Sequence, residues 1–173
     1  NLSGDHLDYH RTMDNYYQAK KLLFTQQLEE GGLAVINVDN AYGERLYREL
    51  SCRKISFGET AAADAKIEIL ELGLTHTVFT LAGETYRTNL TGRHNVFNLS
   101  GVLLSLIDCG FSPAELRQKL LTPILVPGRL ERIETPKKVH FFVDYAHTDD
   151  ALENVLKLLR SVAAGRVIAV FGA

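Results

Sequence analysis

The chain has 173 residues, a formal net charge of −2 at pH 7 and 46% hydrophobic side chains. This composition indicates an ordinary folded protein with one core or parts of two, and it lacks the basic stripe that would favour a nucleic acid partner. No apolar run approaches the ~20 residues that span a bilayer, so we expect no membrane contact. Cys52 and Cys109 lie outside any C-x-x-C pattern, so we expect free thiols and a cytoplasmic monomer.

The chain begins with a polar loop that could bind a hard cation. Asp5, His6, Asp8 and His10 supply oxygen and nitrogen ligands within six positions, just ahead of a predicted helix. Mg2+ takes oxygen ligands, occasionally with an imidazole, and uses few protein contacts beside substrate phosphates. Loops of this kind are more often solvated turns with an Asx cap, so the residue types alone leave both interpretations open. Because Asn1 is not a natural start, we expect a piece of a longer chain.

An amphipathic helix is predicted from about residue 12 to residue 29. At roughly 100° per residue, its apolar side chains cluster on one side, with Lys20 in the middle of that side and Lys21 at its edge. An unpaired ammonium group out of water loses its solvation. Lys20 must therefore snorkel along its neighbours, which is the commonest solution, or be paired, neutral or chemically altered.

From Gly31 onward the chain alternates strands and helices. Residues 33–38 form a short apolar run suited to a buried parallel strand, and residues 44–50 have helical periodicity. Asn37 and Asp39 fall at the carboxyl end of that strand, where a doubly wound fold binds its ligand. Capping of the next helix is the commoner role for such residues, and we expect it here.

Between residues 54 and 90 the apolar residues recur at every second position, and residues 82–84 suit a hairpin turn. This pattern predicts a small antiparallel sheet added to one side of the main sheet.

Two helices are predicted after this sheet. The first opens at residues 91–98, a glycine-containing turn that suits a cap, a phosphate or a base edge. The second starts with a capping box from Ser112 to Glu115.

The last part of the chain predicts the start of a second α/β unit. Residues 127–131 suit a linker into a new strand, and we expect a second strand at residues 139–144, a helix at about residues 150–162 and a parallel strand at residues 166–172. The predicted fold class is therefore α/β. It combines part of a doubly wound parallel-sheet domain, a small antiparallel sheet and the beginning of a second Rossmann-like domain.

Several stretches resemble the Mur ligases, the family that builds the peptidoglycan stem peptide. The chain is most similar to the members that add the third residue, although His94 replaces their usual Phe and Asp149 replaces a usual Pro. The resemblance covers nearly the whole chain. It rests on these stretches, which occur in family order: Asn1-Leu-Ser-Gly-Asp-His-Leu-Asp-Tyr-His10, Tyr16-Tyr-Gln-Ala-Lys-Lys-Leu-Leu-Phe24, Gly92-Arg-His-Asn-Val-Phe-Asn98, Pro127-Gly-Arg-Leu-Glu131 and Asp144-Tyr-Ala-His-Thr148.

The resemblance implies a metal site. In the family, the His of the Asp-His-x-Asp loop binds Mg2+ and the Lys of the Ala-Lys helix is carbamylated. By position these residues are His6 and Lys20, which would be both metal ligands and catalytic residues. A carbamate (N6-carboxylysine) turns a cation into an anionic oxygen ligand, and its formation needs a neutral amine, which burial favours.

The resemblance also implies an ATP site. Asn98 would approach the adenine, Arg129 the phosphates, and Asp144 the ribose or base side, with His147 in the same motif. An arginine fits a phosphate through its planar fork, and an aspartate accepts from a hydroxyl group. Without the resemblance, Arg129 would be an ordinary surface pair and Asp144 a strand-end cap.

For a complete enzyme the resemblance implies ADP-forming amide ligation. The partners would be UDP-MurNAc-L-Ala-D-Glu and a diamino acid, either meso-diaminopimelate or L-lysine, joined through an acyl phosphate. Residues 1–127 would end the central ATP-binding domain, and residues 128–173 would start the carboxyl-terminal domain. No Gly-x-x-x-x-Gly-Lys-Ser/Thr phosphate loop occurs in the sequence, so we expect this piece to be inactive alone.

Two alternatives stay open at this point. One is another ligase on the same scaffold, such as a different Mur ligase or a folylpolyglutamate synthase, which would share the ATP chemistry but not the acceptor. The other is a folded fragment that only binds a partner.

Overall fold

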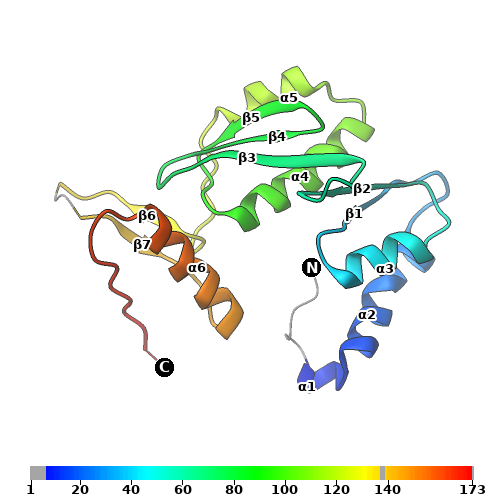
Figure 1. The fold of residues 1–173 in the computed structure, drawn as a ribbon, viewed down its shortest axis with the longest axis horizontal. Helices are drawn as coiled ribbons and strands as arrows, with labels where there is room; N and C mark the ends of the chain where they lie inside the picture. Colours follow the sequence, from blue (N-terminus) through cyan, green and yellow to red (C-terminus); the bar gives the residue numbers. More distant parts are fainter. Residues whose placement is uncertain (1–6, 137–138, 173) are drawn as a thin grey trace.

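The computed structural model describes residues 7–136 and 139–172. Figure 1 shows its elements along the chain. They are α1 (Leu7–His10), α2 (Met13–Leu22), the π-helix η1 (Leu23–Gln27), β1 (Ala34–Asn37), α3 (Ala41–Glu49), β2 (Lys54–Gly58), β3 (Ala65–Leu72), β4 (Thr77–Leu81), β5 (Glu84–Thr88), α4 (Arg93–Asp108), α5 (Pro113–Leu120), β6 (Glu131–Ile133), β7 (Phe141–Val143) and α6 (Asp149–Val162).

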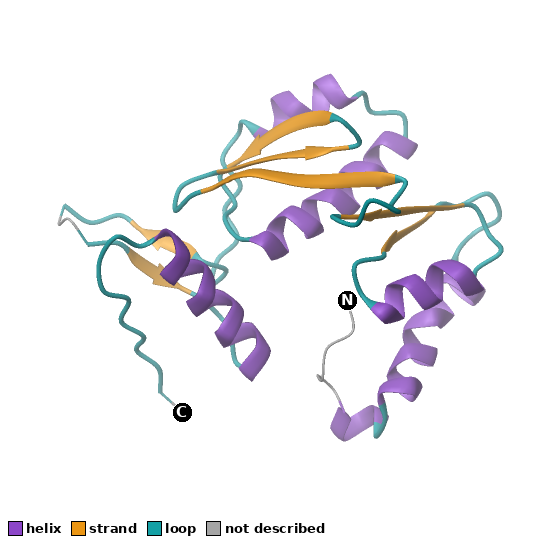
Figure 2. Cartoon of the chain, in the orientation of Figure 1, coloured by secondary structure: helices purple, strands orange, loops and turns teal. Residues whose placement is uncertain are grey.

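Five strands form one mixed sheet in the order β1-β2-β3-β4-β5, drawn in orange in Figure 2. β1, β2 and β3 are parallel, whereas β3, β4 and β5 are antiparallel. The hairpin between β4 and β5 turns at Ala82 and Gly83, both with positive φ, as tight hairpins of this hand require. The predicted α/β class with an antiparallel addition is confirmed.

β1 is covered on both faces because successive strand side chains point to opposite sides. Ala34 and Ile36 pack with Tyr17 of α2 and Leu46 of α3. Val35, between them, packs against a larger core that α4 and α5 form with β2 to β5. The buried members of that core are Phe57, Ala65, Ile67, Phe79, Leu81, Tyr86, Val96, Phe97, Leu99, Leu103, Leu104, Leu116 and Leu120.

The helix α2 begins as predicted but continues differently. The Thr12 hydroxyl caps it by accepting a hydrogen bond from the N–H of Asn15 at 3.1 Å. The expected continuation to residue 29 is instead the π-helical turn η1, which ends at Gln27. A π-turn has more residues per turn than an α-helix, so a single 100° wheel does not describe both parts.

The prediction that Lys20 lies in the middle of a buried stripe is therefore wrong. Lys20 is exposed. Lys21 takes the half-buried position, with 25% of its side chain accessible and an ion pair to Glu49. Leu23, which the single wheel places on the apolar side, is 61% exposed. Burial gives no reason for a chemical modification of Lys20.

The helix after β1 is capped by Asn40, not by Asn37 or Asp39 as we expected. The Asn40 side chain accepts a hydrogen bond from the N–H of Gly43 at 2.9 Å. α3 consequently starts three residues before the predicted residue 44. The side chains of Asn37 and Asp39 instead accept backbone hydrogen bonds in the loops after β1 and β2.

Both helices after the sheet form where predicted. α4 starts after Gly92, whose φ of 98° favours a residue without a Cβ atom. α5 starts with the predicted capping box, in which the Ser112 hydroxyl accepts from the Glu115 N–H and the Glu115 carboxylate accepts from the Ser112 N–H. α4 packs across β1 to β4, and α5 packs on β5.

The last part of the chain contains β6, β7 and α6 but not the predicted final strand. β6 and β7 form an antiparallel pair, and α6 begins one residue before the predicted helix. Residues 166–172 have no strand partner within the described part of the chain. Ile168, Val170 and Phe171 are accordingly 73%, 94% and 84% exposed. A strand exists only where a neighbour pairs with its backbone, so apolar residues alone do not make one.

None of the described helices combines the length and apolar character needed to cross a membrane. Cys52 and Cys109 are both free thiols, as the sequence predicts.

Candidate functional site

The carboxyl end of β1 is the point where three clefts meet. Asn37, the last residue of β1, lines all three. Its Oδ1 atom accepts a hydrogen bond from the N–H of Asp39 at 2.9 Å, and the Asp39 carboxylate accepts from the N–H groups of Glu59 and Thr60 at 2.8 and 3.0 Å. These bonds join the loops after β1 and β2. Ligands of open α/β sheets bind at this edge.

Lys20 lies on the first of these clefts. The cleft has a volume of about 190 Å³ and is lined by residues of α2, η1, β1 and α3, including Asn37 and Asn40. The Lys20 Nζ atom lies 5.3 Å from the centre of the Tyr16 ring, which is an attractive cation–π distance. Although Lys20 is exposed, it therefore shares a cleft with the carboxyl end of β1.

The loop ahead of α2 ends beside the same tyrosine ring. His10 stacks on Tyr16, with ring centres 4.8 Å apart and planes inclined by 17°. The His10 carbonyl accepts a hydrogen bond from the side-chain amide of Asn15 at 3.0 Å. Arg11, between α1 and α2, has a φ of 63° and makes the turn between them. The predicted metal-binding loop thus leads to the ring over which Lys20 lies.

Asn98 lies on the second cleft, which runs along α4 and has a volume of about 580 Å³. Phe57 and Phe97 line it together with Asn37. Asn95, one turn earlier, is engaged locally, since its side-chain amide donates to the carbonyl of Thr91 at 2.8 Å. Asn98 is thus exposed on this cleft, while Asn95 stabilises the start of α4.

Arg129 lies on a turn that Asp144 holds in place. The Asp144 carboxylate accepts from the N–H of Leu130 at 2.7 Å and from the N–H of Ala146 at 2.8 Å. Leu130 has a φ of 45°, which is costly for this residue type and needs such support. The Arg129 guanidinium lies 5.7 Å from the centre of the Tyr145 ring. Asp144 is therefore a structural cap as well as a predicted nucleotide ligand.

His147 contacts the same aromatic ring. Its ring centre lies 5.2 Å from that of Tyr145 in an edge-on arrangement, and its Nδ1 atom lies 3.0 Å from the Tyr145 carbonyl oxygen. Arg129 and His147, which come from separate sequence motifs, therefore both pack on Tyr145.

His94 lies at the start of α4, where the charges of this turn act on its imidazole. Loss of solvent around the imidazole lowers the pKa of His94, while the Asp144 carboxylate raises it and the Arg129 guanidinium lowers it. His94 also lines the third cleft, which has a volume of about 590 Å³ and joins Asn37 to α6. The residues of α6 that line this cleft are Asn154, Lys157, Leu158 and Ser161.

Two family models match the chain with this arrangement. The Mur ligase middle domain matches residues 1–106, and the Mur ligase glutamate ligase domain matches residues 128–173. The chain belongs to the Mur ligase family.

The UDP-N-acetylmuramoyl-L-alanyl-D-glutamate–2,6-diaminopimelate ligase of Geobacter metallireducens is 39% identical to this Mur ligase chain over 181 residues. That match covers 99% of the chain and 35% of the relative, so the chain spans about a third of its length. A solved structure of a ligase with the same name has 30% identity and a TM-score of 0.72, covering 94% and 34% of the two chains. MurF from Acinetobacter baumannii has a TM-score of 0.82 at 22% identity, covering 94% and 36%, which shows a shared fold.

The structure places the predicted Mur ligase residues in two groups. Lys20 and Asn98 line separate clefts that share Asn37. The other group is the Arg129 turn, whose charged side chains act on the pKa of His94 at the start of α4. The binding roles of these residues, and the domain boundary after residue 127, stay predictions.

The predicted metal ligands can be followed only in part. Asp5 and His6 lie outside the described residues, as does the side chain of Asp8. The His10 ring packs on an aromatic neighbour. Within residues 7–136 and 139–172, no group of three or more His, Cys, Asp or Glu side chains could hold a metal ion.

The cleft of Lys20 nevertheless suits Mg2+ chemically. Mg2+ prefers oxygen donors and few protein contacts. Asn37 and Asn40 bring amide groups to the cleft, and the oxygen of each also accepts a backbone hydrogen bond. A metal here would depend on a carboxylate oxygen gained by carbamylation of Lys20 and on His6. Of these two ligands, only Lys20 lies among the described residues, where its side chain is exposed on this cleft.

The sequence did not reveal the full set of contacts that Asn37 and Arg93 make at the site. Asn37 was visible as a strand-end residue, but its contact with three clefts depends on long-range packing. Arg93 pairs with Glu59 and lies 4.4 Å from the centre of the Phe97 ring. No sequence signal pointed to Arg93, because its partner is 34 residues away.

Proposed function

We propose that this chain is part of a UDP-MurNAc-L-Ala-D-Glu:meso-diaminopimelate ligase, an ATP-dependent cytoplasmic enzyme of peptidoglycan precursor synthesis. The observation that carries the proposal is the 39% identity, across 99% of the chain, to a ligase that is named for that reaction. The same match favours diaminopimelate over lysine, which the sequence alone leaves open.

The proposed reaction makes an amide in two steps. The D-Glu carboxylate attacks the γ-phosphorus of ATP, the bond to the bridging oxygen breaks, and ADP leaves with that electron pair. The diaminopimelate amine then attacks the acyl carbon, loses a proton and expels phosphate. The protein has to bring anions together, so positioning and charge stabilisation supply most of the catalysis.

Three of the described residues suit the binding of ATP. Arg129 would bind phosphate oxygens through its planar fork. Asp144 holds the turn of Arg129 through two backbone hydrogen bonds, which limits the positions that the guanidinium can take. Asn98, exposed on the cleft along α4, would contact the adenine.

The metal half would depend on Lys20 and His6, which would hold Mg2+. When bound, the ion would neutralise charge between the carboxylate and the phosphates. Lys20 would become a ligand when its neutral amine attacks the carbon of CO2 and loses a proton. Since Lys20 is exposed, CO2 can reach it, and the carbamate would be stabilised by its neighbours rather than by burial.

The test is ADP release by the complete enzyme with UDP-MurNAc-L-Ala-D-Glu and ATP. We expect release with meso-diaminopimelate and none with L-lysine or L-glutamate. Release with lysine would correct the acceptor. Release with none of the three would contradict the proposal and favour another ligase on the same scaffold.

A further inference from the structure

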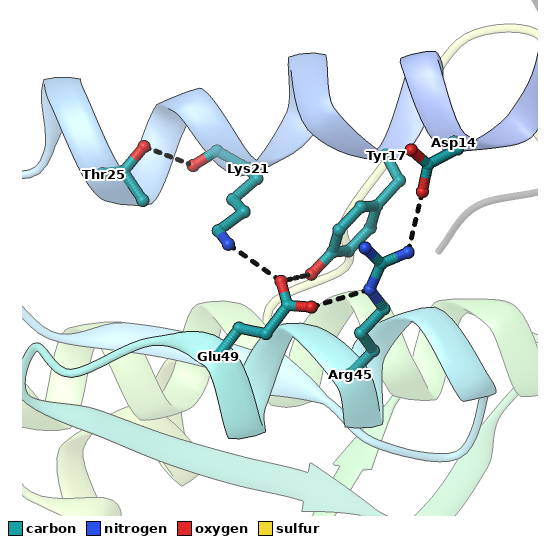
Figure 3. Close-up of polar contacts among 6 residues, drawn as sticks. All are labelled: Asp14, Tyr17, Lys21, Thr25, Arg45 and Glu49. Atoms are coloured by element: carbon teal, nitrogen blue, oxygen red, sulfur yellow. Dashed lines mark hydrogen bonds and ion pairs between the residues drawn. The ribbon is translucent and has the colours of Figure 1, made fainter.

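A polar network joins α2 to α3, as Figure 3 shows. Asp14, Tyr17 and Lys21 lie at positions i, i+3 and i+7 of α2 and therefore form one stripe along the helix. Arg45 and Glu49, at i and i+4 of α3, face that stripe. Every member of the stripe bonds to one of these two residues.

Glu49 is the centre of the network. One of its carboxylate oxygens accepts from the Tyr17 hydroxyl at 2.6 Å and from the Lys21 ammonium at 2.8 Å. The other accepts from the Arg45 Nε atom at 2.7 Å. Arg45 in turn donates to Asp14 at 2.8 Å. A single carboxylate thus connects three side chains of two helices, and the loss of its charge would weaken all three bonds.

The network also encloses an aromatic ring. Tyr17 is 1% exposed, and the Arg45 guanidinium lies 4.2 Å from its ring centre. Tyr17 also belongs to the core formed with Ala34 and Ile36 of β1. α2 is therefore fixed against rotation by apolar packing and by the bonds to Glu49.

This arrangement determines where Lys20 points. Lys21 is held on α3, and the preceding residue of an α-helix points about 100° away from it. That direction is the cleft lined by Asn37 and Asn40. A rotation of α2 by 20° would move a side chain at the helix surface by roughly 2 Å, since the helix radius with side chains is about 5–6 Å.

We propose that Glu49 is a positioning residue, which fixes the rotation of α2 so that Lys20 is presented to Asn37 at the carboxyl end of β1. The inference rests on the proposed function, because it gives Lys20 a role in the reaction. Glu49 itself touches no substrate. It acts through α2, and a displacement of the order of 1 Å can lower a rate by about a hundredfold.

The test compares Glu49→Gln with a matched control in the complete ligase. Gln keeps the size of the side chain but removes the charge that three donors share. Glu44→Gln is the control, because Glu44 lies on the same helix and pairs only with the exposed Arg48 at 3.3 Å among the contacts described. Tyr17→Phe is a milder variant that removes one hydroxyl and serves if Glu49→Gln fails to fold.

Two readouts separate positioning from stability. The first is the carbamate carbon signal of Lys20, recorded by 13C NMR in 13C-bicarbonate. The second is the split between kcat and KM for ATP. We expect Glu49→Gln to weaken the carbamate signal and to lower kcat by about tenfold to a hundredfold, with KM little changed. Glu44→Gln should match the wild type in both.

An equal carbamate signal and equal kcat in wild type, Glu49→Gln and Tyr17→Phe would overturn the positioning role and leave the proposed function intact. Absence of the carbamate signal from the wild type would overturn the assignment of Lys20, and with it this inference. A lower melting temperature with an unchanged signal would show that Glu49 is only structural.

Discussion

Lys20 and Arg129, two side chains to which the proposed reaction gives a role, are held in place by different means. The helix of Lys20 is fixed by polar and charged side chains that meet at Glu49. The turn of Arg129 is fixed by backbone N–H groups that meet at Asp144. The position of Lys20 should therefore depend on the charge of Glu49 and on pH. The position of Arg129 should depend on the single acceptor Asp144. The comparison teaches that one enzyme can position similar side chains with different sensitivities.

Removal of Lys20 should have the largest effect. In the complete ligase, Lys20→Ala should reduce turnover to below about 1% of wild type, because a group that stabilises charge in the transition state commonly contributes a hundredfold or more. Lys66→Ala, at an exposed lysine of β3 that pairs with Glu68, is the control and should turn over normally. Steady-state ADP release measures both, and normal turnover of Lys20→Ala would refute the metal-ligand assignment.

Removal of Asp144 should affect stability and ATP binding together. Asp144→Ala leaves two N–H groups without their acceptor, at a cost of about 2 kcal/mol, and frees the turn of Arg129. Arg129→Ala should raise KM for ATP without this loss of stability. Urea unfolding and KM measurements on both variants sharpen the comparison. An Asp144→Ala protein with unchanged stability would show that its backbone bonds contribute nothing.

The stability of the α2–α3 contact should depend on pH at both extremes. Hydrogen bonds from Lys21, Tyr17 and Arg45 lower the pKa of Glu49 from 4.5 to about 2. The stabilisation is therefore complete above pH 4.5 and is lost as pH falls towards 2. Burial, aided by Glu49, raises the pKa of Tyr17 from 10.0 to about 12, so its contribution is lost as pH rises from 10 towards 12.

Urea unfolding of the complete ligase across this pH range checks the expectation. The midpoint should fall at both ends, and Glu49→Gln should reduce the acid-side change. A Glu49→Gln protein with the same acid dependence as wild type would assign the change to other carboxylates.

The smallest effect on activity is expected for a substitution that touches neither Lys20 nor Arg129. Ser112→Ala removes the capping box of α5 and should cost about 1 kcal/mol of unfolding free energy, while kcat stays at the wild-type value. Thermal unfolding and ADP release are the measurements. A fall in kcat would mean that general destabilisation alone can mimic the effects expected at Lys20 and Arg129.

Local signals in the sequence predicted most of the fold. The capping box at Ser112, the hairpin at Gly83 and the alternation along β3 to β5 are all confirmed, because each depends on residues close in the chain. The missing strand at residues 166–172 shows the opposite case. Its apolar composition was correct for a strand, but pairing requires a partner from elsewhere.

The site was predictable as a set of motifs but not as an arrangement. The helical projection placed Lys20 in the middle of the apolar side because it assumed one regular α-helix. It could not include the π-helical turn that begins at Leu23 or the ion pair between Lys21 and Glu49. The residues alone favoured Asp144 as a strand-end cap, and its bond to the N–H of Ala146 confirms this, whereas its bond to the N–H of Leu130 joins residues 14 positions apart. The sequence did not reveal the long-range contacts, which are those of Glu49 with α2 and of Asp144 with Leu130.

The most direct test of the account is a crystal structure of the complete ligase with ADP and Mn2+ in place of Mg2+, in which anomalous scattering locates the metal. The account predicts a metal peak bound to a carboxylated Lys20, in the cleft that Asn37 lines. A metal bound away from this cleft, with Lys20 unmodified, would contradict it.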